Sequence, residues 1–141
     1  MKFLITGGEG FVGSALCHTL AERCHEVTSI DNHFNNCSRP RHQYVDYIVA
    51  DCKDILNTHL KDKSFDYIFH LGEYARVEQS FDDFEKVIDY NLKSFPVMLQ
   101  FAKDKGAKFI YSGSSTKFAV GEEGRAQSPY AYTKAQNTEL L

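Results

Sequence analysis

The 141-residue sequence predicts an α/β fold built on a doubly wound parallel sheet. Short apolar segments alternate along the chain with segments in which apolar residues recur every three or four positions. Gly7, Gly10 and Gly13 follow the first apolar segment, and polar residues follow the other predicted strands. Because such sheets bind ligands at the carboxyl ends of their strands, these glycines and polar residues are the first candidates for a functional site.

Five segments are predicted as strands because each is short, apolar and bounded by glycine or polar residues. They are residues 2–6, 26–30, 44–50, 67–71 and 108–112. Residues 11–21 predict the first helix, since Phe11, Ala15 and other apolar residues recur at helical spacing. Residues 54–63 predict a second helix from a weaker helical period.

Residues 81–105 predict a long helix with one face toward the core. Pro96 interrupts this helix, because proline lacks the N–H group that the helix needs. Either the helix kinks there, or a second helix begins with Ser94 as its cap and Pro96 in its first turn. Residues 130–141 predict a last helix that continues to the final residue. We therefore expect one doubly wound domain over residues 1–141 that is truncated at the C-terminus.

Composition bounds the possible functions. The chain has 43% apolar residues, enough for one globular domain, and a formal net charge of −3. This charge gives no basic field for nucleic acid or an anionic membrane, so we expect small soluble ligands. No apolar run approaches the length of a membrane span, and no signal-peptide pattern precedes the first strand, so a cytoplasmic location is expected.

The four cysteines predict neither a metal site nor a disulfide framework. Cys17, Cys24, Cys37 and Cys52 match no Cys-x-x-Cys metal motif, and their spacing is too wide for a dense set of disulfides. We expect Cys17 and Cys24 to pack on one face of the first helix.

The glycine turn predicts a dinucleotide site. Gly7, Gly10 and Gly13 allow a tight turn, a close approach of a pyrophosphate, and packing of the new helix on the strand. Asp31 ends the next predicted strand and is placed to accept hydrogen bonds from an adenosine ribose, which favours NAD over NADP. The alternative is an ordinary turn with Asp31 in solvent. Asp51 ends the third strand and either approaches the adenine or only caps the following helix.

Tyr130 and Lys134 predict acid–base chemistry. They are four positions apart, so they lie on the same face of the last helix. A free tyrosine has a pKa of about 10, and nearby positive charge stabilises its phenolate form. Hydroxyl residues from Ser112 to Thr116 follow the fifth strand, and one of them can bridge a substrate alcohol and the tyrosine. The alternatives are a solvated tyrosine–lysine pair and hydroxyls that only make turn hydrogen bonds.

Together these motifs resemble the extended short-chain dehydrogenase/reductase family. The matching residues are Gly7 to Gly13, Asp31-Asn32, His70-Leu71, Asn91, Ser112 to Ser114 and Tyr130 to Lys134. Within this family, the sequence is most similar to NAD-dependent sugar-nucleotide epimerases and dehydratases, UDP-glucose 4-epimerase among them.

The resemblance implies roles for individual residues. It implies that Ser114 is the catalytic hydroxyl residue, Tyr130 the base, and Lys134 the residue that holds the nicotinamide ribose and tunes Tyr130. Asn91 resembles the helix residue that anchors the active site through the backbone. The expected cofactor contacts are Gly7, Gly10, Phe11, Val12, Gly13, Asp31, Asn32, Asp51, Cys52, Leu71, Gly72, Asn91, Tyr130 and Lys134.

Four departures from the family pattern qualify the resemblance. Ser115-Thr116 stands where dehydratases usually have an acidic pair, which favours epimerisation over dehydration. Glu73 and Tyr74 stand where the family usually has small or neutral residues. The segment between Ser114 and Tyr130 is shorter than usual, and family members are about twice as long. The resemblance therefore implies an NAD-binding Rossmann-type domain over residues 1–141, without the C-terminal substrate domain.

The leading hypothesis is the N-terminal part of an NAD-dependent sugar-nucleotide epimerase that acts through a 4-keto intermediate, with a UDP-sugar as the expected substrate. The alternatives are an NAD-binding module without catalysis, and a dehydratase or reductase of the same family. The resemblance also implies a homodimer formed by the helices at 81–105 and from residue 130 onward. Val87, Val97 and Phe101 lie beyond one core stripe and fit such a dimer, or else they cover the sheet.

Overall fold

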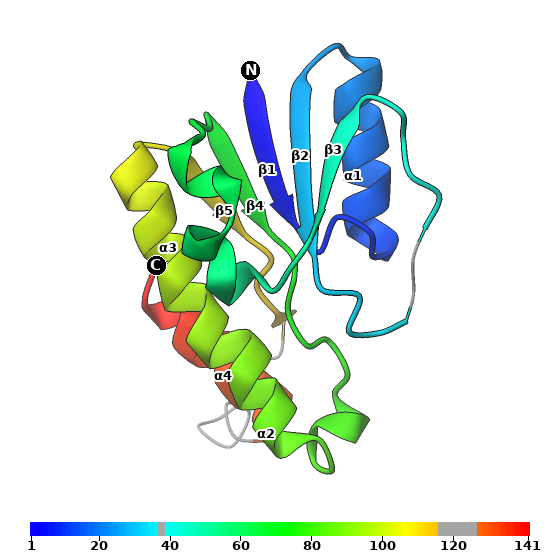
Figure 1. The fold of residues 1–141 in the computed structure, drawn as a ribbon. Helices are drawn as coiled ribbons and strands as arrows, with labels where there is room; N and C mark the ends of the chain where they lie inside the picture. Colours follow the sequence, from blue (N-terminus) through cyan, green and yellow to red (C-terminus); the bar gives the residue numbers. More distant parts are fainter. Residues whose placement is uncertain (37–38, 116–126) are drawn as a thin grey trace. The chain divides into compact units, whose positions relative to one another are not determined.

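The computed structural model describes residues 1–36, 39–115 and 127–141 (Figure 1). It divides into two compact units. The first consists of Met1–Gly72 and Val97–Tyr111, and the second of Glu73–Pro96 and Ser112–Leu141.

The first unit contains a five-stranded parallel sheet with the order β3-β2-β1-β4-β5. Its strands are β1 (Lys2–Thr6), β2 (Glu26–Asp31), β3 (Val45–Val49), β4 (Tyr67–His70) and β5 (Lys108–Tyr111). The chain builds outward from β1 on one side and then crosses to β4 on the other. This order confirms the predicted doubly wound sheet and puts the point of reversal between β1 and β4.

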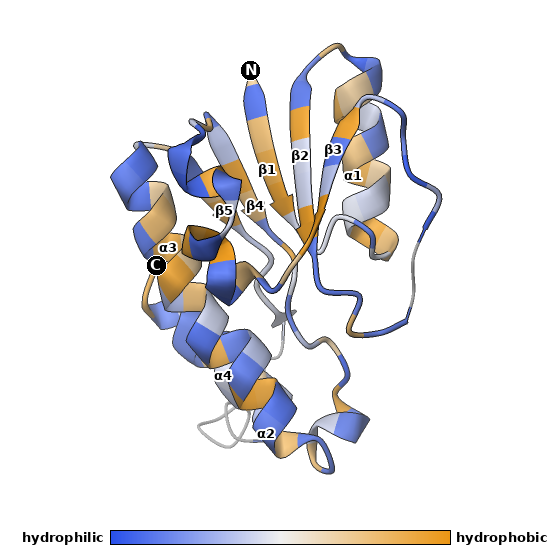
Figure 2. Cartoon of the chain, viewed as in Figure 1, coloured by the Kyte–Doolittle hydropathy of each residue, from blue (hydrophilic) through white to orange (hydrophobic). Residues whose placement is uncertain are grey.

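Both faces of the central strand β1 are buried in the first unit. Neighbouring residues of a strand point to opposite faces, so Leu4 packs with Met98 and Phe101 on one side while Ile5 packs with Cys17 on the other. The helix on the first side is α3 (Ser94–Lys105), and the helix on the second is α1 (Phe11–Glu22). Figure 2 shows the apolar residues of the strands in orange. Each fully buried aliphatic side chain contributes about 2 kcal/mol to stability.

The prediction of a helix over residues 54–63 is wrong. Two short 3₁₀-helices stand there instead, η1 (Cys52–Asn57) and η2 (His59–Asp62). Thr58 separates them with an extended backbone, and its hydroxyl accepts a hydrogen bond from Leu60 N. The weak apolar periodicity corresponds to two buried side chains, Ile55 and Leu60, and not to a continuous helix.

The prediction for the first two cysteines is half wrong. Cys17 is buried on α1, as expected, and burial together with the charges of Glu9 and Asp31 raises its pKa to about 12. Cys24 lies beyond the end of α1, is exposed, and has a left-handed backbone with φ of 59°. Cys37 lies outside the described residues.

The second unit is built mainly from helices. They are η3 (Glu78–Ser80), α2 (Phe84–Val87), the π-helix η4 (Ile88–Lys93), the first residues of α3, and α4 (Pro129–Glu139). Thus the region expected as one long helix contains a π-helical segment just before Pro96. Pro96 lies in the first turn of α3, as predicted. Ser94 is not the cap of α3 but its first residue, and its hydroxyl donates to Tyr90 O.

One hydrogen bond joins the π-helix to α4 through the backbone. The Asn91 carbonyl accepts from Asn137 Nδ2 of α4 at 3.0 Å. The start of α4 agrees with the sequence, since the Ser128 hydroxyl caps it by accepting from Ala131 N. Its end does not agree, because α4 stops at Glu139 instead of continuing to Leu141.

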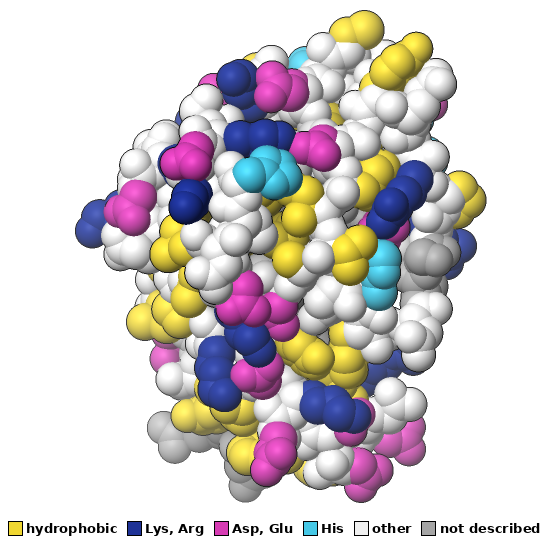
Figure 3. All heavy atoms as spheres, viewed as in Figure 1, with side chains coloured by type: hydrophobic (Ala, Val, Ile, Leu, Met, Phe, Trp, Pro, Cys, Tyr) yellow, Lys and Arg dark blue, Asp and Glu magenta, His cyan; other side chains and the backbone are white. Residues whose placement is uncertain are grey.

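The residues cited for a dimer face have different surroundings. Phe101 is buried and Val97 partly buried against the core of the first unit, which favours the alternative that these two cover the sheet. Val87 is buried and belongs to the second unit, and the homodimer remains a prediction. Lys and Arg side chains are intermixed with Asp and Glu on the face drawn in Figure 3. Within the described residues, no helix combines the length and the apolar character needed to cross a membrane.

Candidate cofactor and catalytic site

The glycine turn after β1 lies against the segment that follows β4. Gly7 has φ of 69°, and a Cβ atom built on it would be 2.8 Å from Gly72 Cα. A Cβ atom on Gly13 would be 2.1 Å from Gly7 O. Side chains at these positions are therefore excluded by backbone atoms, as predicted for a tight turn on which a helix packs closely. Gly72, which was expected among the cofactor contacts, is part of this close approach.

Thr6 joins the ends of β1 and β4. Its hydroxyl oxygen accepts hydrogen bonds from Leu71 N at 3.1 Å and Gly72 N at 2.8 Å, and lies 2.9 Å from His70 Nδ1. Thr6 is fully buried, so these bonds are shielded from water. They fix the backbone at the carboxyl edge of the sheet, where α/β folds bind ligands.

The N-terminus of α1 fits a pyrophosphate. Gly10 is the N-cap residue and provides no side-chain capping bond to the first amides of the helix. Phe11 and Val12, the first two residues of the helix, are 75% and 63% exposed despite being apolar. Uncapped amides at a helix N-terminus attract anions, and the glycines leave room for the ligand backbone to approach. Expected contacts at Gly10, Phe11, Val12 and Gly13 thus share one end of α1.

Asp31 lies at the end of β2 beside the glycine turn. Its Oδ2 accepts from Glu9 N at 3.0 Å, and its Oδ1 accepts from His33 N at 2.9 Å. This contradicts the alternative of an aspartate in open solvent. The two backbone bonds fix the carboxylate beside the turn, which is where a ribose-binding acid has to be.

Asn32, Asp51 and Cys52 lie at the ends of β2 and β3. Asp51 accepts from Lys53 N at 3.1 Å and caps η1, so its capping role is confirmed while its approach to adenine remains a prediction. Asn32 Nδ2 donates to the same carboxylate at 3.3 Å. Cys52 is buried in the core, with its thiol 3.9 Å from Gly72 O. The three residues therefore line the same edge of the sheet as Asp31.

Glu9 was not identified from the sequence as a functional residue. Its side chain, in the middle of the glycine turn, is only 2% exposed. Its carboxylate is 2.8 Å from Arg41 Nε and 2.6 Å from His33 Nε2. Burial alone raises the pKa of Glu9, but the hydrogen bonds and charges of Arg41 and His33 outweigh burial and lower it. A charged residue inside a glycine turn is the signal that could have identified this cluster.

Replacing Glu9 by glutamine is expected to destabilise the protein near neutral pH by about 1 kcal/mol, through loss of charge-assisted hydrogen bonds. Because folding lowers the pKa of Glu9 from 4.5, its carboxylate stabilises the fold above that pH. The contribution disappears as the pH falls through the lowered pKa. Urea unfolding at pH 7 and at about pH 3 should therefore give a smaller difference between wild type and Glu9→Gln in acid.

Glu22→Gln serves as the matched control for that experiment, because Glu22 is an exposed carboxylate on α1. It should leave stability nearly unchanged at both pH values. An equal loss of stability for Glu9→Gln at the two pH values would contradict the role assigned to the charge.

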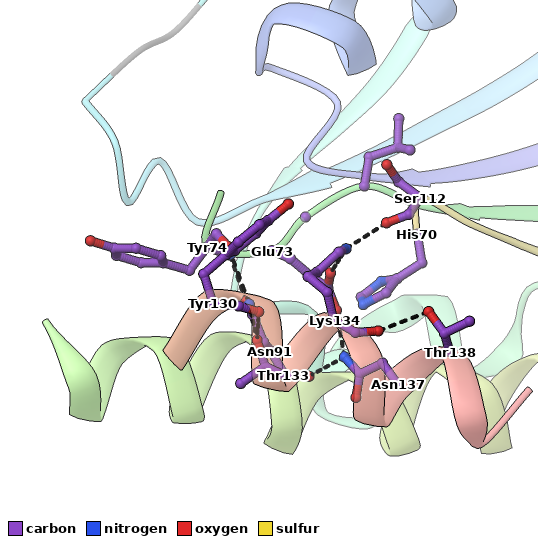
Figure 4. Close-up of polar contacts among 12 residues, drawn as sticks. His70, Glu73, Tyr74, Asn91, Ser112, Tyr130, Thr133, Lys134, Asn137 and Thr138 are labelled. Atoms are coloured by element: carbon purple, nitrogen blue, oxygen red, sulfur yellow. Dashed lines mark hydrogen bonds and ion pairs between the residues drawn. The ribbon is translucent and has the colours of Figure 1, made fainter. Parts of the chain in front are cut away.

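In the second unit, the side chains of Tyr130 and Lys134 project from the same side of α4 (Figure 4). The Lys134 ammonium forms an ion pair with Glu73 and donates a hydrogen bond to the carbonyl of Ser112, the residue after β5. The exposed fractions of the Lys134 and Glu73 side chains are 6% and 4%. The alternative of a solvated lysine on a surface helix is therefore wrong.

Asn91 holds together three segments of the second unit. Its Oδ1 accepts from Tyr74 N at 2.7 Å, and its Nδ2 donates to Tyr74 O at 3.1 Å and to Thr133 Oγ1 at 2.9 Å. Asn137, also on α4, donates to Glu73 Oε1 at 2.8 Å. The Asn91 side chain thus binds the backbone of Tyr74, and its role as an anchor of an active site remains a prediction.

Tyr74 and Ser114 complete the described part of this site. Tyr74 is buried, and its hydroxyl donates to Asp83 at 2.9 Å. Burial and the bond to Asp83 raise the pKa of Tyr74. Ser114 is half-buried, two residues beyond Ser112, while Thr116 lies outside the described residues.

The predicted site residues thus fall into two groups. The glycine turn, Asp31 and the residues after β3 and β4 belong to the first unit. The catalytic candidates and Asn91 belong to the second. Sequence reasoning missed Glu9, Arg41 and Asn137, although Asn137 follows Lys134 by three positions and so shares its helix face. Among the described residues, no three His, Cys, Asp or Glu side chains are grouped to hold a metal ion.

Comparison with known proteins gives a family match over nearly the whole chain. Residues 3–141 match the family described as the NAD dependent epimerase/dehydratase family. The chain is similar to a UDP-N-acetyl-alpha-D-glucosaminuronate decarboxylase of Bacillus cytotoxicus, with 29% identity over 85% of this chain and 38% of that protein. It is also similar to a UDP-glucose 4-epimerase of Lactobacillus helveticus, with 24% identity over 100% of this chain and 46% of that protein. The chain spans less than half the length of these two relatives.

A solved structure shares the fold. It is described as UDP-glucose-4-epimerase from Stenotrophomonas maltophila with bound NAD and formylated UDP-arabinopyranose. The TM-score is 0.85 and the identity 23%, over 100% of this chain and 47% of that chain. The fold and the resemblance predicted from the motifs are therefore confirmed, and the family description names NAD, the cofactor predicted from the glycine turn.

Proposed function

Because the chain belongs to the NAD dependent epimerase/dehydratase family, we propose that it is the cofactor-binding part of an NAD-dependent sugar-nucleotide epimerase. The observation that carries the proposal is the placement of Lys134. Its ammonium is buried on the same side of α4 as Tyr130 and is bound to the carbonyl that follows β5. A surface pair would have no reason to be fixed in this way, whereas acid–base chemistry requires a fixed cation beside the tyrosine.

Epimerisation is favoured over the other reactions of the family by the residues after Ser114. Ser115 and Thr116 replace the acidic pair expected for dehydration. The similarity to the UDP-glucose 4-epimerase of Lactobacillus helveticus covers 100% of this chain and 46% of that protein. The proposed substrate is therefore a nucleotide sugar, most simply a UDP-sugar, whose C4 hydroxyl is inverted.

The proposed mechanism divides the chemistry between three side chains. Tyr130 takes the proton of the sugar 4-hydroxyl, and Ser114 donates a hydrogen bond to the same oxygen during the transfer. Lys134 supplies the positive charge that stabilises the phenolate form of a tyrosine. When bound, NAD would supply the acceptor for the C4 hydride and the donor for its return. The 4-keto sugar turns its other face before the hydride returns, and Tyr130 gives the proton back, so that neither hydride nor proton is consumed.

The remaining residues bind and orient the cofactor in this proposal. The uncapped amides of α1 hold the pyrophosphate, and Asp31 accepts the ribose hydroxyls. A 2'-phosphate at that ribose would meet the carboxylate of Asp31, whose two oxygens are already held by backbone N–H groups. This arrangement favours NAD over NADP.

Calorimetric titration of the 141-residue chain with NAD and NADP tests the cofactor part of the proposal. NAD is expected to bind at least about tenfold more tightly than NADP, since a phosphate close to a carboxylate costs about 1.4 kcal/mol or more. Equal affinity would contradict the role of Asp31, and binding of neither nucleotide would contradict the proposed function.

The reaction itself is tested by incubating the NAD-bound chain with UDP-glucose and UDP-galactose. Interconversion without release of NADH supports epimerisation. Steady production of NADH would indicate a reductase or dehydrogenase instead, and NAD binding without any turnover would support a binding module.

A further inference from the structure

Glu73 provides a buried negative charge that the proposed mechanism does not use. It follows Gly72 directly and replaces the small or neutral residue expected from the family resemblance. Its Oε2 forms the ion pair with Lys134, and its Oε1 accepts from Asn137 Nδ2 at 2.8 Å. Both partners belong to α4, so the carboxylate is held at two points of one helix (Figure 4).

This arrangement changes the charge beside the reacting groups. Without Glu73, the Lys134 ammonium would contribute one full positive charge in a site from which water is largely excluded. With Glu73, the two side chains together carry no net charge, although the ammonium still points at the Ser112 carbonyl. The carboxylate therefore holds the lysine in place, so that the ammonium still acts on groups that it contacts directly, while at larger distances the opposite charges of the pair largely cancel.

We propose that Glu73 is a positioning residue for Lys134 that sets the charge balance of the site in favour of oxidised NAD over NADH. The inference rests on the proposed function, in which Lys134 lies at the nicotinamide ribose. The oxidised nicotinamide ring is positively charged and the reduced ring is neutral. A neutral Glu73–Lys134 pair does not repel the oxidised ring, whereas an isolated Lys134 does.

The charge balance has a consequence for turnover. An epimerase has to recover its hydride from the cofactor before the sugar leaves. Stabilising the oxidised cofactor favours return of the hydride to the keto sugar, and so opposes release of an oxidised product. Glu73 therefore favours a closed cycle over net oxidation of the substrate.

The test compares the affinities of NAD and NADH for variants of the whole 141-residue chain, without any assay of activity. The measured quantity is the dissociation constant of NAD divided by that of NADH, from calorimetry or from NADH fluorescence. Losses that affect both forms of the cofactor equally cancel in this ratio. Glu73→Gln keeps the shape and removes the negative charge, so the ratio should rise roughly tenfold, toward weaker NAD binding.

Two further variants test the direction in which the ratio of dissociation constants shifts. Lys134→Met leaves Glu73 as an isolated negative charge and should lower the ratio. The double variant Glu73→Gln with Lys134→Met is neutral again and should return the ratio to within about threefold of wild type. If Glu73→Gln fails to fold because Lys134 loses its buried ion pair, the shift of Lys134→Met and the return of the ratio in the double variant still test the proposal.

Asn137→Ser is the matched control, because it removes the bond to Glu73 Oε1 without changing any charge. It is expected to lower stability but to leave the ratio unchanged. A ratio that stays within twofold of wild type in both single charge variants would overturn the proposal and leave Glu73 with a structural role. If the wild-type chain binds neither NAD nor NADH, the proposed function fails instead, and the two failures are therefore distinguishable.

Discussion

Gly13→Ala is expected to destabilise the protein by about 3 kcal/mol, the cost of severe overpacking in a closely packed site. The added methyl carbon would be 2.1 Å from Gly7 O and 2.8 Å from Gly8 Cα. Both are backbone atoms, so no side chain can move aside to relieve the contact. Relief requires α1 to move away from β1, which breaks the packing that supports the glycine turn. The free energy of unfolding in urea measures the loss.

Gly10→Ala is the control within the same turn. Its added methyl carbon would meet only Gly7 O, at 3.2 Å, and the φ of Gly10 is −77°, which alanine adopts without strain. The expected cost is about 1 kcal/mol or less, mainly from a poorer N-cap. If Gly10→Ala were as destabilising as Gly13→Ala, the loss would reflect a general sensitivity of the turn and not the contact with Gly7 O.

Asn91→Ala is expected to cost about 3 kcal/mol, because it removes three hydrogen bonds to buried polar groups. The side chain of Asn91 satisfies both the N–H and the carbonyl of Tyr74 and also binds the hydroxyl of Thr133. Alanine can replace none of these bonds, and each unsatisfied buried group costs about 1–3 kcal/mol before relaxation. Thermal and urea unfolding measure the change, and hydrogen exchange at the Tyr74 amide should accelerate.

Lys93→Ala provides the comparison from the same π-helix. Lys93 forms an exposed ion pair with Asp89 at 3.0 Å, and its side chain is 64% exposed. Such a pair contributes about 0.5 kcal/mol or less. A similar loss in the two variants would mean that the helix, and not the bonds of the Asn91 side chain, determines the effect.

The sheet could be predicted from the sequence because the patterns that indicate strands involve residues close together along the chain. Each strand is a short apolar run, and the alternation of strands with helices predicts that the sheet is parallel. Gly7 and Gly13 stood at the first junction and marked the cofactor turn. The helix over 54–63 could not be judged in the same way, because two apolar residues at helical spacing do not distinguish an α-helix from two 3₁₀ turns separated by Thr58.

The parts of the site that were missed depend on partners far away in the sequence. Glu9 meets Arg41, and Glu73 meets Lys134, so neither carboxylate could be assigned a partner from spacing along the chain. Glu73 was recognised only as an unusual residue for the family it resembles. The lysine motif predicted a cation near the tyrosine, but not the carboxylate that neutralises it. Local patterns thus predict the scaffold and the reacting groups, while charge balance depends on tertiary contacts.

The bond between the Asn91 carbonyl and Asn137 joins the π-helix to α4 without using the Asn91 side chain. Its acceptor is a peptide group, which no substitution of the Asn91 side chain removes. Its donor is the side-chain amide of Asn137, which also binds Glu73. A substitution at Asn91 therefore leaves this link between the two helices in place, whereas a substitution at Asn137 removes it.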